Sequence, residues 1–298
     1  MDEALENPGF KEYMDETIDY FKLKRDSLME PFLPVPDNPI GNLAVVYKNG
    51  EYYRMDTHYS TAAQVTQLIN VEWNQDFPYN YFCPTVNTSN QGYYPSLQGK
   101  AAVGCVPIAI GQIMSYHEYP LVYDTITFNW NLIKFSPYYN NISPESMETA
   151  KLLYRVGLCA SVDYGYESSA NFLNAQSALG QMGYSFEASS FSRNKVISSL
   201  NNLKPVYIRG TSPDGGHAWV IDGYRIMRYW KDYYTVDPPY TYCFNEYEDT
   251  DYFHCNWGWG GNYNGYFLNT FRIYKQDGTS LPFNGGNKII YDIEPYEP

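Results

Sequence analysis

One cysteine, Cys105, stands where a glycine-rich run of small residues gives way to a helical pattern, in the segment GKAAVGCVPIAIGQIMSYHEYP. Pro107 suits a first helical turn, and the apolar residues that follow the cysteine recur at helical spacing: Val106, Ile110, Ile113 and Met114. Cys105 would therefore lie at the positive end of a helix dipole, where the field favours a thiolate over a thiol. The predicted chemistry is nucleophilic attack by sulfur, although a cysteine taken alone is more often a buried core residue.

A thiol nucleophile needs a base, and His217 is the best candidate among the four histidines. It follows Gly215 and Gly216, which let the backbone approach a neighbour closely, and it opens the strand-like run HAWVIDGY, which would fix the imidazole. The other three are weaker candidates because they fall in a linker, at a helix end and in a strand with a packing role: His58, His117 and His254.

A third group must orient the imidazole, and Asn256 in HCNWGWGGNYNGYF is the candidate. An amide acceptor on one ring nitrogen would fix the tautomer, so that the other nitrogen faces the thiol. Trp257 and Trp259 would shield that hydrogen bond from water. On these residues alone, a β-corner rich in aromatic residues and glycine is the favoured interpretation.

An attacked carbonyl also needs donors for its developing negative charge, and Gln75 is the candidate side chain. Its amide NH₂ would act together with the backbone N–H of Cys105 at the helix start. Gln98, which closely precedes the cysteine, is the alternative.

The N-terminal part of the chain is predicted to be a separate unit. Residues 10–29 have an apolar face at helical spacing, formed by Phe10, Met14, Ile18 and Phe21. Four prolines then mark an extended linker: Pro31, Pro34, Pro36 and Pro39. LAVVYKNGEYYRM follows as a hairpin with Asn49 and Gly50 in its turn. We therefore divide the chain into residues 1–58, a candidate pro-segment or its remnant, and residues 59–298.

The remaining elements predict an α+β protein. Ser60 is expected to cap a helix carrying Val65, Leu68 and Ile69, and further helices are expected over 143–157 and 171–182. From Pro205 onward, short β-type runs alternate with turns. A mostly helical first part and a mostly β second part favour two subdomains with a cleft between them.

The composition excludes several classes of protein. The net charge of −13 disfavours nucleic acid and anionic membranes as partners. The five cysteines are odd in number and lack zinc-like spacing, which argues against a disulfide scaffold and a metal site. No apolar run is long enough to span a bilayer. The start, MDEALENPGF, lacks a signal-peptide pattern, so either the protein stays inside the cell or a leader has been removed.

Six ordered segments together resemble the streptopain-type (C10-like) cysteine peptidases of the papain-like superfamily: WNQDFPYNYFCP, VGCVPIAIGQIMSYHEYP, FNWNLI, AKLLYRVGLCASVDYGYES, GGHAWVIDGY and HCNWGWGGNYNGYF. The resemblance runs from about residue 60 to about residue 275. It implies a papain-like fold of two subdomains, a helical one bearing the cysteine helix and an antiparallel β subdomain bearing the histidine and the asparagine.

The resemblance also implies roles. Cys105 would be the nucleophile, His217 the general base and acid, Gln75 the oxyanion-hole side chain, and Asn256 with Trp257 the pair supporting the histidine. The enzyme would be a cysteine endopeptidase that needs no cofactor and favours an apolar residue two positions before the cleaved bond. Candidate substrate contacts are Gly215, Gly216, Trp259 and Arg209. A zymogen, secreted or bound to the cell envelope, would be expected, with protein or peptide substrates and with its own N-terminal segment or a proteinaceous inhibitor as further partners.

Three features depart from the family pattern. The stretch between Gly223 and Phe253 is long, aromatic and acidic, and is expected to form a rim over the cleft. Arg209 stands where an uncharged polar residue is expected, and residues 1–58 are short for a pro-domain of this family. Two alternatives stay open, an amidase or transferase on the same fold and a catalytically silent binding protein. The intact set of candidate catalytic residues argues against the second.

Overall fold

The computed structural model describes residues 43–86, 94–274 and 279–296. The helix predicted over 10–29 and the proline-rich linker lie outside these residues. Within the described ranges, no helix combines the length and the apolar character needed to cross a membrane.

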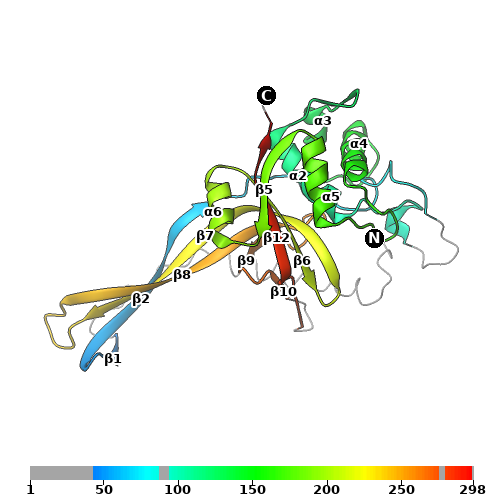
Figure 1. The fold of residues 1–298 in the computed structure, drawn as a ribbon. Coiled ribbons are helices and arrows are strands. Elements are labelled where there is room, and N and C mark those ends of the chain that lie inside the picture. The colour runs from blue at the N-terminus through cyan, green and yellow to red at the C-terminus, as the bar shows by residue number, and fades with distance from the viewer. Residues whose placement is uncertain (1–42, 87–93, 275–278, 297–298) are drawn as a thin grey trace.

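A single antiparallel sheet of eight strands organises the molecule (Figure 1). The strand order is β1-β2-β7-β6-β12-β5, and β8 pairs with β7 on its other side and carries β9 at its end. The strands are β1 (Ala44–Lys48), β2 (Glu51–Val65), β5 (Tyr184–Ser190), β6 (Val206–Ser212), β7 (Gly215–Tyr234), β8 (Tyr242–Asn256), β9 (Gly265–Phe267) and β12 (Gly285–Pro295).

The helices lie beside the sheet, and most of them gather at its β5–β6 end (Figure 1). They are α2 (Cys105–His117), α3 (Trp130–Ile133), α4 (Pro144–Cys159), α5 (Phe172–Gln181), α6 (Arg193–Asn201) and the short 3₁₀ helix η2 (Pro95–Leu97). Two small hairpins complete the described chain: β3 (Val122–Tyr123) with β4 (Ile126–Thr127), and β10 (Arg272–Tyr274) with β11 (Ser280–Pro282).

Several helices begin where the sequence predicts them. Ser143 caps α4 through a capping box with Ser146, and Asn171 caps α5 by accepting a hydrogen bond from the Asn174 N–H. The helix α2 begins at Cys105, as its apolar spacing predicts.

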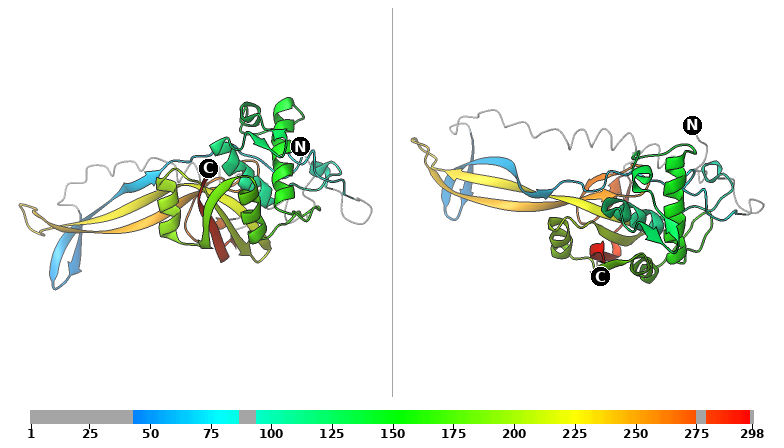
Figure 2. Two further views of the ribbon diagram at one scale, coloured as in Figure 1. Left: turned by 45° about the horizontal axis from the view of Figure 1, so that its top comes forward. Right: turned by 90° about the horizontal axis from the view of Figure 1, so that it is seen from above.

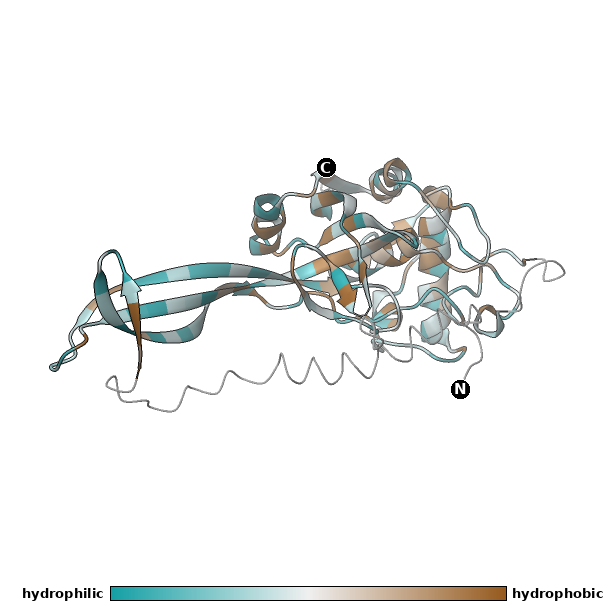
Figure 3. Cartoon of the chain, turned by 90° about the horizontal axis from the view of Figure 1, so that it is seen from below, coloured by the Kyte–Doolittle hydropathy of each residue, from teal (hydrophilic) through white to brown (hydrophobic). Residues whose placement is uncertain are grey.

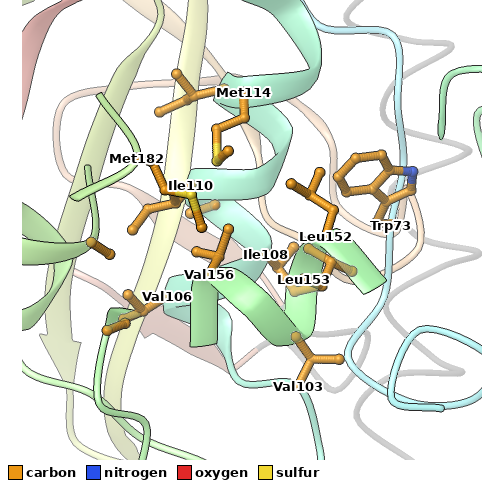
Figure 4. Close-up of a cluster of buried hydrophobic side chains, with 14 of the residues drawn as sticks. Trp73, Val103, Val106, Ile108, Ile110, Met114, Leu152, Leu153, Val156 and Met182 are labelled. Carbon is orange, nitrogen blue, oxygen red and sulfur yellow. The ribbon is translucent and has the colours of Figure 1, made fainter. Parts of the chain in front are cut away.

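Alternating side chains place a separate core on each face of the sheet. Tyr207, Ala218 and Val220 point toward α2, α4 and α5, whereas their neighbours Ile208 and Trp219 belong to the core on the opposite face. Figure 4 shows the first core, in which Ile108 and Met114 of α2 lie among residues of α4 and other segments, including Leu152, Leu153, Val156 and Trp73.

The two central helices pack closely because one position on α2 has no side chain. A Cβ added at Gly111 would lie 2.6 Å from the Leu153 Cδ2 atom and 3.3 Å from the Trp73 ring. The helix carrying Cys105 is therefore held firmly against α4 and the segment around Trp73.

The long aromatic stretch does not form a rim over the cleft. Its residues make up the distal halves of β7 and β8, which pair with each other and with β2 to form an arm that projects away from the helices (Figure 2). Hydrophilic residues predominate along this arm, whereas hydrophobic residues are more frequent in the strands and helices of the body (Figure 3). Charged pairs such as Arg228–Asp249 and Lys231–Glu248 line the ladder between β7 and β8.

The predicted helix beginning at Ser60 is wrong. The hairpin turn at Asn49 and Gly50 is present, but its second strand continues as β2 to Val65. Ser60 pairs in register with Arg228, and its hydroxyl accepts a hydrogen bond from the Trp230 indole. Pairing with β7 outweighs the local helical preference, because strand propensity depends on the neighbouring strand. The boundary predicted at residue 58 consequently falls inside β2.

Candidate active site

Cys105 is the first residue of α2, a helix that packs against β7. Gly104 precedes it with φ +91°, a conformation that favours glycine. The sulfur receives backbone hydrogen bonds from Ala218 on β7 and from Cys105 and Val106 at the helix start. Burial raises the pKa of the Cys105 thiol, and these hydrogen bonds and the charge of Arg209 act in the opposite direction.

His217 lies on β7 directly before Ala218 and is 8% exposed. Its Nε2 lies 2.8 Å from the backbone carbonyl oxygen of Trp257. A carbonyl can only accept a hydrogen bond, so in this contact Nε2 carries the proton and the neutral ring presents Nδ1 as its basic nitrogen. Burial lowers the pKa of His217 to about 4, and the hydrogen bond to Trp257 opposes that shift.

The cysteine and the histidine meet where the N-terminus of α2 packs against β7. The Cys105 sulfur accepts a hydrogen bond from the backbone of Ala218, the residue next to His217. Within the described chain, the thiol and the imidazole are not hydrogen-bonded to each other. Because burial penalises each charge separately, the neutral thiol and imidazole are favoured here, and a thiolate would form together with an imidazolium that compensates it.

Indole rings enclose the imidazole. Trp259 stacks on His217 with ring centroids 4.3 Å apart, and Trp257 and Trp219 lie parallel to it at 6.0 and 6.2 Å. These ring faces flank the His217–Trp257 hydrogen bond, whereas the bond that Trp257 and Trp259 are predicted to shield, between Asn256 and the imidazole, is absent. They would also attract an imidazolium through cation–π interaction.

Asn256 forms no hydrogen bond with the imidazole among the described residues, contrary to the prediction. Its Oδ1 accepts hydrogen bonds from Gln112 Nε2 at 2.9 Å and from the Gly258 N–H at 3.3 Å. Its Nδ2 donates to the Val71 carbonyl at 2.7 Å. Asn256 therefore joins the cysteine helix to the strand end that carries Trp257, and the acceptor on the imidazole is the Trp257 backbone.

Gln75 is tied to the turn that precedes Cys105. Its carbonyl accepts a hydrogen bond from the Val103 N–H at 2.8 Å, and Asn74 Oδ1 accepts one from the Gln75 N–H. The Gln75 side chain is half-buried and has no hydrogen-bond partner in the described chain. Gln98, the alternative, is an exposed residue at the end of η2. The backbone contact with Val103 ties Gln75 to a position two residues before Cys105.

The remaining candidate residues lie on the β6–β7 hairpin. Gly215 and Gly216 are exposed and Arg209 is half-buried, with its Nη2 3.6 Å from the point that a Cβ on Gly216 would occupy. No close backbone approach at Gly215 is present among the described residues. Among the described residues, no group of three or more His, Cys, Asp or Glu side chains is arranged so that it could hold a metal ion.

A family model matches the part of the chain that holds this site. The model of the peptidase C10 family covers residues 73–267, which is more than half of the sequence and includes every candidate above. The chain belongs to the peptidase C10 family. It is accordingly a cysteine-type peptidase, and its α+β fold is the papain-like one that the motifs predict.

Relatives with known names support this membership of the C10 family. Streptopain from Streptococcus pyogenes is 28% identical, and the match covers 82% of this chain and 68% of streptopain. The thiol protease/hemagglutinin PrtT from Porphyromonas gingivalis is 24% identical over 75% of this chain, which spans only 26% of that larger protein.

Solved structures share the C10 fold. Active wild-type interpain A, a cysteine protease from Prevotella intermedia, superposes with a TM-score of 0.56 at 21% identity, covering 77% of this chain and 95% of its own. A prointerpain A fragment from the same organism has a TM-score of 0.55 at 21% identity and covers 98% of this chain and 85% of its own.

Two features of this C10 site were not predicted from the sequence. Gln112 is a fully buried polar side chain within the apolar helix α2. Its position seven residues after Cys105, on the same helical face, is a signal that could have marked it. The Trp257 carbonyl has no such signal, because every residue carries a carbonyl and only the fold selects one.

Proposed function

We propose that this peptidase hydrolyses peptide bonds through the Cys105 sulfur, with His217 as base and acid. The Cys105 proton passes to His217 Nδ1 as the sulfur bonds to the substrate carbonyl carbon. The imidazolium then protonates the leaving amine, the C–N bond breaks and a thioester remains. Water, deprotonated by Nδ1, attacks the thioester, and the C–S bond breaks to release the acid.

The hydrogen bond from His217 to Trp257 carries this proposal. It fixes the tautomer in which Nδ1 accepts the proton, while the backbone contact with Ala218 holds the sulfur beside the histidine. Three stacked indoles keep water away from that bond. No metal or cofactor takes part in these steps.

The oxyanion is assigned to Gln75 and the Cys105 N–H. The half-buried Gln75 amide is free of other hydrogen bonds in the described chain, and its backbone is tied to Val103 just before the cysteine. Asn256 acts as a support, because it joins Gln112 on the cysteine helix to the segment bearing Trp257. The first assignment rests on the backbone contact of Gln75 with Val103, and the second on the hydrogen bond of Asn256 with Gln112.

Substrate contact is assigned to Trp259, which stacks on the histidine, and to three residues of the β6–β7 hairpin near it: Gly215, Gly216 and Arg209. A preference for an apolar residue two positions before the cleaved bond follows from likeness to the family. The aromatic surroundings of His217 are compatible with it.

The proposed reaction is tested by incubating the purified chain and Cys105→Ala with peptide libraries, with and without an added amine. We expect new N-termini, produced only by the chain with Cys105. Transfer of the acyl group to the amine in preference to water would instead favour a transferase on the same fold. Absence of any product, with substrates still bound, would favour a silent binding protein.

We also propose that residues 1–58 are a pro-segment or its remnant, in a secreted zymogen. Likeness to solved structures supports this, since the match to the prointerpain A fragment covers 98% of this chain and the match to active interpain A covers 77%. Because β2 crosses residue 58, cleavage there would split a strand of the arm. N-terminal sequencing of the full chain during self-digestion tests the proposal, with Cys105→Ala as the control. A new N-terminus before Trp73 supports it, and a fully active chain that stays uncut contradicts it.

A further inference from the structure

Two cations stand side by side on the sheet, next to the contact that holds the Cys105 sulfur. Ala218 pairs in register with Arg209 on β6, and Arg209 pairs in register with Lys288 on β12. Residues that pair directly across antiparallel strands point to the same face. That face is the one packed against α2, because Tyr207 and Val220, two positions away along each strand, belong to the core around that helix.

Neither cation has an acidic partner in the described part of the chain. Lys288 lies over the Phe172 ring, with its Nζ 5.5 Å from the centroid, and it forms no ion pair. Seven other lysines and arginines do pair with carboxylates: Lys48, Lys134, Lys151, Arg193, Lys204, Arg228 and Lys231. Arg209 and Lys288 therefore place two positive charges together beside the Cys105 contact, in a protein whose net charge is −13.

Two adjacent positive charges, on Arg209 and Lys288, destabilise the folded chain unless an anion binds between them. Like charges directly opposite each other on neighbouring strands destabilise a sheet, and Arg209 is half-buried. Gly216 is exposed, and a Cβ there would lie 3.6 Å from Arg209 Nη2, so the absence of a side chain leaves the guanidinium uncovered on this side. The positive charge of Arg209 also reaches the sulfur itself, which places it within range of a substrate bound there.

We infer that Arg209, with Lys288 beside it, binds a carboxylate of the substrate close to the cleaved bond. This inference rests on the proposed peptidase function and adds a class of substrate to it: peptides with an acidic group near the scissile bond. A planar guanidinium binds a carboxylate through two parallel hydrogen bonds, and the ammonium adds a second positive charge. The carboxylate belongs either to an Asp or Glu side chain or to the C-terminus of the peptide.

Matched peptides separate these sources. One series carries Glu or Gln at each of the three positions on either side of the cleaved bond. The other ends in a free acid or an amide soon after that bond. The kcat/KM ratio within each matched pair is measured for the unmodified chain and for Arg209→Gln, Arg209→Lys and Lys288→Gln. The control is Lys195→Gln, which removes a cation from α6 on the opposite face of the sheet.

We expect the unmodified chain to prefer the acidic member of one pair by about 10- to 100-fold, the usual strength of a charge-assisted hydrogen bond. Arg209→Gln should abolish that ratio, Arg209→Lys should keep part of it, and Lys288→Gln should reduce it. Lys195→Gln should leave it unchanged. A preference confined to the acid/amide series identifies the C-terminal carboxylate, and one confined to a Glu/Gln position identifies a side chain.

Two outcomes contradict the inference. Equal cleavage of both members of every pair overturns it while the proposed peptidase function stands. An equal loss of kcat/KM for acidic and neutral peptides in Arg209→Gln also overturns it, since Arg209 would then act on the sulfur alone. If neither member of any pair is cleaved, the proposed function fails, and the inference fails with it.

Discussion

The imidazole of His217 is held by a backbone atom, the carbonyl oxygen of Trp257, which lies 2.8 Å from Nε2. Substituting the Trp257 side chain would leave this carbonyl in place. The effect of the hydrogen bond is therefore tested through neighbouring side chains, those of His217 and Asn256. The bond leaves Nδ1 as the basic nitrogen, and this fixes the direction in which the Cys105 proton can move.

Substituting His217 should change the pH at which Cys105 reacts. In His217→Asn the sulfur loses its proton acceptor, and burial then keeps its pKa above the usual value for a thiol, about 8.5. We therefore expect alkylation of Cys105 in this variant to require a more alkaline pH than in the unmodified chain. The measurement is the rate of labelling against pH, read at Cys105 by mass spectrometry. Superimposable profiles would remove His217 from the role of base.

Substituting Gln75 should slow turnover without reducing the reactivity of the Cys105 sulfur toward an alkylating reagent. Loss of one oxyanion donor costs on the order of 10²–10³ in kcat in a comparable enzyme, whereas alkylation needs no oxyanion. Gln75→Ala should therefore be labelled at Cys105 at nearly the normal rate. Gln98→Ala is the matched control, and it should leave both rates unchanged. A fall in turnover in the control alone would transfer the role to Gln98.

Asn256 should contribute more to stability than to the chemical step. Asn256→Ala removes the partners of Gln112 Nε2 and of the Val71 carbonyl, both of which are buried. Each unsatisfied buried group costs about 1–3 kcal/mol, so we expect the free energy of unfolding to fall by about 2–4 kcal/mol.

The same variant should lose less kcat than His217→Ala does. Gln112→Ala is the matched control, and the double variant should show less than the sum of the two destabilisations, because both changes break one contact. If Asn256→Ala instead lost as much kcat as His217→Ala at unchanged stability, Asn256 would have to act directly on the imidazole.

Stability should fall as the solution is acidified. His217 takes up a proton near pH 6.5 in the unfolded chain and only near pH 4 in the folded one, because burial disfavours its charge. Its stabilising contribution is present above pH 6.5 and is lost as the pH falls toward 4, by about 3 kcal/mol. Burial lowers the pKa of His117 to about 4 as well, so its slope has the same sign.

Denaturant unfolding at several pH values measures this dependence. His217→Asn should show a shallower fall between pH 6.5 and 4, and His117→Asn should show a separate, similar reduction. A slope unchanged in His217→Asn would mean that the imidazole accepts a proton in the folded chain as readily as in the unfolded one.

Local patterns predicted those elements that are stabilised by their own sequence. The helix at Cys105, the cap at Asn171 and the turn at Asn49 and Gly50 depend on residues close together in the chain, and all are present. Ser60 shows the limit of such patterns, because β2 is stabilised by β7, more than 150 residues later in the sequence.

In the candidate site, too, some features could be predicted from residue types and motifs, and others depend on packing between distant segments. Cys105, His217 and Trp257 could be selected by residue type and motif, and the fold brings them to one place. The partner of Asn256 could not be selected, because its side chain can bond equally well to an imidazole or to an amide. Only packing decides that Gln112 on α2 lies opposite it. The charge of Arg209 could be noticed in the sequence, whereas the position of Lys288 beside it depends on the register of β12.

The central claim is that Cys105 alone performs the chemistry, and labelling with an epoxide thiol inhibitor tests it most directly. The labelled chain is digested, the adduct is located by mass spectrometry, and the remaining peptide hydrolysis is measured on the same sample. We predict one adduct, on Cys105, with hydrolysis lost in proportion to labelling, and neither labelling nor hydrolysis in Cys105→Ala. An adduct chiefly on Cys83, Cys159, Cys243 or Cys255, or hydrolysis that survives in Cys105→Ala, would contradict the account.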